Sequence, residues 1–220
     1  MIKTKEQEEI LKLIGMTLKK RVECYIVGGT AMMFLGLKEA TKDIDIVFEK
    51  KEHYEEFRKV LLHLGAKETE TKIINRQKIS SILTLGNAKF DLFFDYLIHF
   101  KLSKSIIERV KEVHEFSNLV VRVVSPEDII LFKSIADREG DRIDAYNLIK
   151  MVNIEWDVIL KEAEEQTKNS EYFFSAFLYN FLIGITTDFK IEIPKGFMNR
   201  LKKIAENAMI EAEKKLKRKV

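Results

Sequence analysis

Residues 25–48 read YIVGGTAMMFLGLKEATKDIDIVF, and two features of this stretch decide the fold that we expect. The glycines Gly28 and Gly29 end one apolar run, and the aspartates Asp43 and Asp45 lie within a second. Side chains two positions apart in a strand point to the same face. Asp43 and Asp45 are therefore expected to project together, while Ile44 points into the core.

Two carboxylates on one face of a strand need a compensating cation. They repel each other, and burying them without compensation is unfavourable by several kcal/mol. Hard oxygen ligands at this spacing suit Mg²⁺ or Mn²⁺. The alternative is that Asp43 and Asp45 lie on a solvent-facing edge strand and have no function.

The glycine pair favours the functional interpretation. Glycine lets a ligand approach the backbone closely, and the residues after Gly28 and Gly29 are expected to open a short helix over 30–37. Free N–H groups at a helix start attract phosphate, and Thr30 would add a hydroxyl donor. The alternative is an ordinary turn between a strand and a helix.

A third carboxylate is expected from a later strand. Residues 88–96 read AKFDLFFDY and are predicted to form one strand, on which Asp91 and Asp95 share a face. Either residue would complete a metal cluster or supply a general base. Asp91 is preferred because it lies in the middle of the strand between two apolar neighbours.

The pattern changes near residue 125, which predicts two parts. Residues 1–124 read as an α+β domain, with a mixed sheet flanked by helices, a helix near 103–112 and a strand over 119–125. SPED at 125–128 has the residues of a helix start, and residues 125–220 are predicted to be a helical region. The first part is the expected catalytic domain.

Composition limits the class of protein. Hydrophobic residues make up 46% of the chain and charged residues 33%, so a folded core is expected. No apolar run approaches the ~20 residues of a membrane helix, and the N-terminal segment has acids where a signal peptide is apolar. We therefore expect a cytoplasmic protein without a membrane segment. The single cysteine excludes an intrachain disulfide and a thiolate zinc site.

Taken together, these motifs resemble those of the DNA polymerase beta type nucleotidyltransferase superfamily. In chain order they are a strand, GGT, a short helix, a D-I-D strand and a later F-D-L strand. Within it, the chain looks most like stand-alone nucleotidyltransferase-like proteins related to abortive-infection toxins. Those also have a helix resembling SPEDIILFKSIADREGDRIDAYNLI, residues 125–149. The resemblance covers residues 22–149. Relatives often carry Arg shortly before the first aspartate, where this chain has Lys38 and Lys42.

The resemblance implies transfer of a nucleotidyl group from an NTP, such as ATP, to a hydroxyl or phosphate of an RNA, protein or small molecule. It assigns the metal ions to three carboxylates and the triphosphate to glycine, hydroxyl and lysine positions. The implied catalytic and metal-binding residues are Asp43, Asp45 and Asp91, and the implied nucleotide-binding residues are Gly28, Gly29, Thr30, Lys42 and Lys133. The alternative is a catalytically weak nucleotide-binding or toxin–antitoxin interaction module on the same fold.

The helical region offers two further hypotheses. From Lys195 to the C-terminus the sequence has nine Lys or Arg and three Glu, so a basic helix could contact an RNA acceptor. The alternative is a solvated face with i,i+4 ion pairs. The apolar faces of this region suggest a homodimer or a protein partner. Arg138, Asp141 and Asp144 are expected to tie two helices together through ion pairs.

Overall fold

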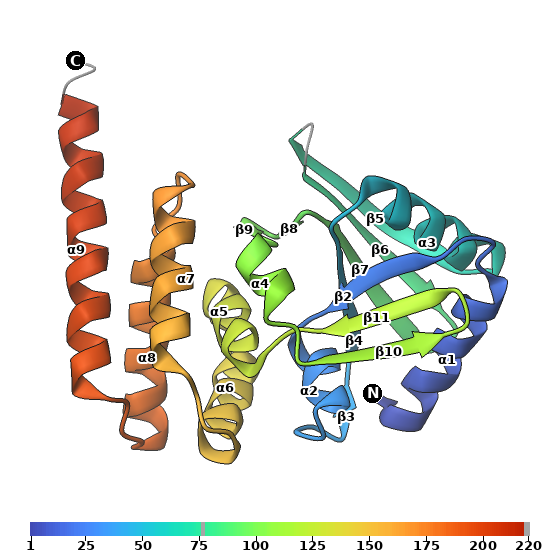
Figure 1. Cartoon of the computed structure of the whole chain (residues 1–220), viewed down its shortest axis with the longest axis horizontal. Helices are drawn as coiled ribbons and strands as arrows, with labels where there is room; N and C mark the ends of the chain where they lie inside the picture. Colours follow the sequence, from blue (N-terminus) through green and yellow to red (C-terminus); the bar gives the residue numbers. More distant parts are fainter. Residues whose placement is uncertain (76–77, 218–220) are drawn as a thin grey trace. The chain divides into compact units, whose positions relative to one another are not determined.

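The computed structural model describes residues 1–75 and 78–217. The chain divides into two compact units, Met1–Ser125 and Pro126–Val220. Figure 1 shows that the first is built from strands and helices and the second from helices. The predicted fold class, a mixed sheet with helices followed by a helical part, is confirmed.

The first unit contains a seven-stranded mixed sheet within its described residues. In spatial order its strands are β10 (Glu112–Phe116), β11 (Leu119–Val123), β2 (Val22–Ile26), β4 (Asp43–Phe48), β7 (Ala88–Phe94), β6 (Lys78–Leu85) and β5 (Lys67–Asn75). The pairs β11–β2 and β4–β7 are parallel, and the other pairs are antiparallel. Two short pairs accompany this sheet, β1 (Ile2–Lys3) with β3 (Ala40–Thr41) and β8 (Tyr96–Leu97) with β9 (Phe100–Lys101).

The apolar face of the sheet packs against two helices. The helices of this unit are α1 (Thr4–Thr17), α2 (Gly28–Phe34), α3 (Lys51–His63) and α4 (Lys104–Glu108). Figure 1 shows α1 and α3 on the same side of the sheet, and both contribute to one core cluster with the strands. Ile44 and Ile46 of β4 and Phe90 of β7 are fully buried in that cluster, as the strand alternation predicts.

Helix α1 lies very close to the β10–β11 hairpin. A Cβ atom built on Gly15 would be 1.8 Å from the carbonyl oxygen of Phe116. The amide of Asn118 donates a hydrogen bond of 3.2 Å to the Gly15 carbonyl, and its side-chain amide donates one of 2.7 Å to the Leu18 carbonyl. The hairpin is therefore fixed to the end of α1 through backbone contacts that only glycine permits.

The second unit consists of helices in its described part. They are α5 (Pro126–Ala136), α6 (Glu139–Met151), α7 (Trp156–Lys168), α8 (Phe174–Phe189) and α9 (Lys195–Lys217). Phe174, Phe181 and Ile185 on the apolar face of α8 are buried, whereas Phe177 is 40% exposed. The aromatic-rich helix α8 thus packs mainly into the core of this unit, where it contacts α5, α6, α7 and α9.

Two predictions in the first unit were wrong. The helix expected near 103–112 ends at Glu108, and residues 112–116 form the edge strand β10 instead. The strand expected over 88–96 ends at Phe94, because Asp95 adopts a left-handed backbone with φ of 60°. Asp95 therefore leaves the pleat that would have aligned it with Asp91.

No helix among the described residues has both the length and the apolar character that crossing a membrane requires.

The contact at Gly15 generates a stability prediction. Gly15→Ala places a methyl group against the Phe116 backbone, and we expect a loss of about 3 kcal/mol in the free energy of unfolding. Gly140→Ala is the matched control, because Gly140 is also helical and a Cβ there meets nothing within 4 Å. The control should gain about 0.5–1 kcal/mol in urea unfolding followed by circular dichroism. Equal stability of both variants would contradict the close contact.

Candidate active site

The register of β4 and β7 brings four charged side chains onto one face of the sheet. The strands pair in parallel with Asp43 opposite Lys89 and Asp45 opposite Asp91. Alternation places all four on the face opposite Ile44, Ile46 and Phe90. The predicted carboxylates therefore come together from two neighbouring strands, with a lysine among them.

Lys89 bridges two of the carboxylates. Its Nζ lies 3.1 Å from Asp43 Oδ1 and 3.1 Å from Asp91 Oδ2. Partial burial acts to lower the pKa of Lys89, but the hydrogen bonds and charges of Asp91 and Asp43 outweigh it, so its pKa is raised above the ordinary value. The ammonium thus stays charged and compensates the repulsion between the two aspartates.

Gly28 and Gly29 form the glycine turn, which is the start of α2 and closes one side of this group. Gly28 has φ of +59°, and a Cβ atom there would be 2.8 Å from Asp45 Oδ2. A Cβ atom on Gly29 would be 2.7 Å from Thr41 Oγ1 and 3.5 Å from Lys38 Nζ. The missing Cβ atoms therefore let the Asp45 carboxylate and the Thr41 hydroxyl lie directly against the glycine backbone, with the Lys38 ammonium nearby.

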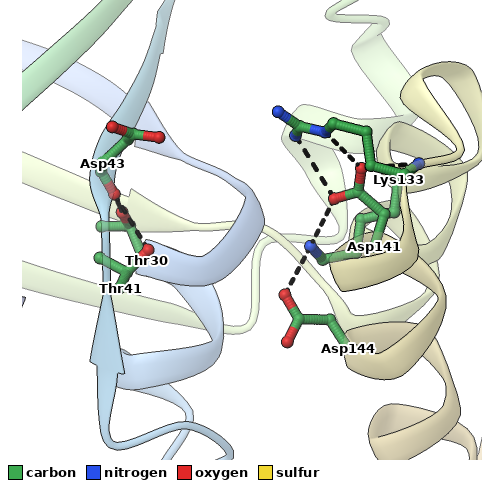
Figure 2. Close-up of polar contacts among 7 residues, drawn as sticks. Thr30, Thr41, Asp43, Lys133, Asp141 and Asp144 are labelled. Carbon is green, nitrogen blue, oxygen red and sulfur yellow. Dashed lines mark hydrogen bonds and ion pairs between the residues drawn. The ribbon is translucent and has the colours of Figure 1, made fainter. Parts of the chain in front are cut away.

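Two buried hydroxyl groups fix β4 beside the glycine turn. Figure 2 shows Thr30 and Thr41 directed at Asp43, and each hydroxyl donates a hydrogen bond of 3.1 Å to the Asp43 carbonyl. Thr30 Oγ1 also accepts a 3.4 Å hydrogen bond from the Asp45 amide. Thr30 is completely buried, so in this structure its hydroxyl holds the backbone between the two aspartates.

Two further residues were predicted to bind the nucleotide, Lys42 and Lys133. Lys42 is exposed on the short connection between β3 and β4. Lys133 belongs to the second unit, where its Nζ lies 3.1 Å from Asp141 and 2.7 Å from Asp144 (Figure 2). Arg138 also pairs with Asp141, at 2.8 Å. The prediction that ion pairs of Asp141 and Asp144 join two helices is confirmed, because both pair with Lys133 of α5, whereas the Arg138–Asp141 pair lies at the start of α6.

The assignment of a metal ion to the carboxylates stays a prediction. In residues 1–75 and 78–217 no three carboxylate, imidazole or thiolate side chains are arranged to hold a metal ion as they stand. Between Asp43 and Asp91 the cation in place is the Lys89 ammonium. Asp95 lies beyond the end of β7. Burial raises its pKa above the ordinary value, although the charge of Lys101 acts to lower it.

Sequence reasoning missed two residues of the site. Lys89 is two positions before Asp91, so the strand period alone places both on one face. Lys38 was noted only as a departure from the relatives, and its approach to Gly29 depends on the path of the connection between α2 and β3. The position of Lys89 on the same face as Asp91 could be predicted from the sequence, whereas the approach of Lys38 to Gly29 could not.

A comparison with protein families identifies the chain. The family described as "Nucleotidyltransferase of unknown function (DUF6036)" matches residues 5–185, which include every residue of the site. The chain belongs to this nucleotidyltransferase family. Its membership confirms the predicted superfamily and implies a nucleotide substrate. No curated protein matches the chain significantly.

One solved structure supports the fold of this chain, and two others show weaker similarity. ANT(2")-Ia, solved in complex with adenylyl-2"-tobramycin, is similar with a TM-score of 0.52 and 17% identity, over 74% of this chain and 99% of that one. JHP933 from Helicobacter pylori has a TM-score of 0.42 and 16% identity, over 98% and 96% of the two chains. An antigenic nucleotidyltransferase-like protein from Paracoccidioides brasiliensis has a TM-score of 0.48 and 15% identity, over 91% and 94%.

The buried ion pairs of Lys133 with Asp141 and Asp144 predict how the stability of this nucleotidyltransferase depends on pH. Burial acts to raise the pKa of Asp141, but Arg138 and Lys133 outweigh it and hold the pKa below its ordinary value. A depressed pKa stabilises the fold above the unfolded value, and this contribution disappears as the pH falls through the folded value. Asp141→Asn should therefore lower the free energy of unfolding by about 2 kcal/mol at neutral pH. The difference in this free energy between the native chain and the variant should narrow below about pH 4.

Urea unfolding between pH 3 and pH 7 measures this effect, because the single tryptophan, Trp156, lies in α7 of the same unit. The control is Asp157→Asn, whose 81% exposed side chain pairs with Arg200 at the surface. Such pairs contribute about 0–1 kcal/mol. A difference between the native chain and Asp141→Asn that stays constant down to pH 3 would contradict the assignment.

Proposed function

We propose that the protein is a metal-dependent nucleotidyltransferase whose active site lies in residues 1–124, with the helical residues 125–220 contributing to recognition of the acceptor. One observation carries the proposal. Asp43, Asp45 and Asp91 are brought onto one face by the parallel register of β4 and β7, beside a glycine turn without Cβ atoms. Membership of a nucleotidyltransferase family supports the same chemistry.

The residues present fit a divalent cation. Three carboxylates supply the hard oxygen ligands that Mg²⁺ and Mn²⁺ prefer. The carboxylates of Asp43 and Asp91 already converge on a cation, because each lies 3.1 Å from the Lys89 ammonium. We assign Asp43, Asp45 and Asp91 as the metal ligands. A bound metal ion would neutralise the phosphates and the leaving group.

The chain's own residues account for binding of the triphosphate. We assign Gly28 and Gly29 at the start of α2 to the triphosphate, in a space that Asp45 Oδ2 and Thr41 Oγ1 border. Lys38 Nζ lies at the border of this space and would neutralise a phosphate. Thr30 keeps the β4 backbone in place rather than contacting the nucleotide. The predicted contact of Lys42 with the triphosphate stays part of the proposal, whereas Lys133, which is buried against Asp141 and Asp144, is not assigned to the nucleotide.

The reaction is an in-line displacement at the α-phosphorus. The acceptor hydroxyl oxygen forms a bond to this phosphorus, the bond to the bridging oxygen of the β-phosphate breaks, and pyrophosphate leaves. The hydroxyl proton passes to a carboxylate or to solvent. We assign Asp91 to orient the attacking hydroxyl, which is the role that the resemblance to the superfamily implies for this position. Positioning and charge neutralisation provide most of the catalysis in such transfers.

The acceptor is proposed to carry a hydroxyl group. ANT(2")-Ia, of the same fold, was solved with adenylyl-2"-tobramycin, an adenylylated small molecule. This favours ATP as the donor to test first and a small hydroxylated molecule as the first class of acceptor. The basic residues of α9 keep RNA as the second class, and transfer to a protein as the third. Incubation with labelled ATP and each class of acceptor in turn distinguishes the three classes by the molecule that becomes labelled.

Nucleotide binding gives the first test. An NTP with Mg²⁺ at 100 times its dissociation constant should stabilise the native chain by about 2.7 kcal/mol. Thermal unfolding with each NTP, with and without Mg²⁺, measures this as a rise in Tm. The Asp43→Asn/Asp45→Asn variant should lose the rise. If no NTP raises the Tm of the native chain at saturation, the catalytic proposal fails and a protein partner becomes the better candidate.

The glycine turn gives a second test with a matched control. Gly28 and Gly86 both have φ of +59°, so alanine at either position should cost about 1 kcal/mol of backbone strain. Only at Gly28 does the new Cβ meet a side chain, Asp45 Oδ2 at 2.8 Å, whereas at Gly86 nothing lies within 4 Å. Gly28→Ala should therefore lose the NTP-dependent rise in Tm and Gly86→Ala should keep it. Retention in both variants would argue against the turn as the nucleotide site.

A further inference from the structure

The Lys89 ammonium lies at the point where β4 and β7 bring two carboxylates together. It contacts Asp43 Oδ1 and Asp91 Oδ2 at the same distance, 3.1 Å. The pairing register causes this, because Lys89 is directly opposite Asp43 and two positions from Asp91 on its own strand. A single positive charge therefore already occupies the position between two of the three proposed metal ligands.

An ammonium and a divalent cation cannot both hold this position. Like charges a few Å apart repel strongly where solvent screening is weak, and both would need the same carboxylate oxygens. We propose that Lys89 is an internal counter-ion that competes with the divalent cation for Asp43 and Asp91, so that metal binding requires its side chain to swing out of the site. The inference rests on the proposed function, because it concerns the same three carboxylates.

The exposure of Lys89 makes this exchange feasible. Its side chain is 37% exposed, and those of Asp43 and Asp91 are 33% and 19% exposed. Lys133 in the second unit also bridges two aspartates, but it is only 7% exposed. A buried ammonium cannot leave its carboxylates without a large desolvation penalty, whereas a partly exposed one on a flexible four-carbon stem can rotate into water.

The consequence is a site that keeps its shape without metal but binds metal weakly. With Lys89 in place the carboxylates are compensated, so β4 and β7 remain paired. A divalent cation must displace the ammonium, which lowers the apparent affinity of the empty protein for the metal alone. Removal of the lysine charge should therefore tighten metal binding, which is the reverse of what removal of a supporting residue would do.

Direct Mn²⁺ binding tests the inference without any need for activity. Loss of the free Mn²⁺ electron paramagnetic resonance signal gives the dissociation constant of the full-length, chelator-treated chain. Lys89→Gln and Lys89→Met should bind Mn²⁺ about tenfold more tightly than the native chain. Lys89→Arg, which keeps the charge, should bind at least as weakly as the native chain. The Asp43→Asn/Lys89→Gln double variant should lose the gain.

The control is Lys59→Gln, which removes the charge of an exposed lysine on α3 and should leave the affinity unchanged. Equal Mn²⁺ affinity in the native chain and Lys89→Gln, or weaker binding in the variant, overturns the inference and leaves the metal proposal standing. Absence of Mn²⁺ binding in every variant overturns both. If Lys89→Met does not fold, the polar Lys89→Gln and Lys89→Arg variants decide the question.

Discussion

The parallel register between β4 and β7 is the constraint on which the rest of the site depends. It places Asp43 opposite Lys89 and Asp45 opposite Asp91, so one face carries three acidic groups and one basic group. Two unit charges 4 Å apart interact by about 4 kcal/mol at the effective dielectric of a protein surface. Two aspartates that share one ammonium are therefore strongly favoured over two that face each other alone. A slip of β4 by one residue would turn Asp43 and Asp45 into the core, away from Lys89 and Asp91.

The surroundings of β4 keep this register rigid. On one face Ile44, Ile46 and Phe48 are fully buried against α1 and α3. At the N-terminal end of the strand, the hydroxyls of Thr30 and Thr41 both donate to the Asp43 carbonyl. A carbonyl that accepts two hydrogen bonds leaves its peptide little freedom to rotate. The aspartates are thus held by groups that do not take part in the proposed chemistry, which is the usual requirement for a preorganised site.

The sequence predicts the carboxylate pair well, because the strand period and the burial of Ile44 and Ile46 decide the direction of both aspartates. It also predicts the helical character of residues 125–220, which begin with a helix-start motif. The edge strand β10 escaped prediction because its stability comes from pairing with β11, not from its own residues. The bridging role of Lys89 escaped because the register between two strands 40 residues apart is a tertiary property. The positive φ of Asp95 has no signal in its own sequence.

The position of β11 in the sheet has a consequence for synthesis of the protein. This strand lies between β10 and β2, although nearly one hundred residues separate it from β2 along the chain. Until residue 123 has left the ribosome, β2 lacks its parallel neighbour and one edge of an apolar strand stays open. Open edges of this kind favour pairing with other chains. The first unit therefore completes its sheet only when its last strand has emerged, so the edge of β2 stays open during most of the synthesis of this unit.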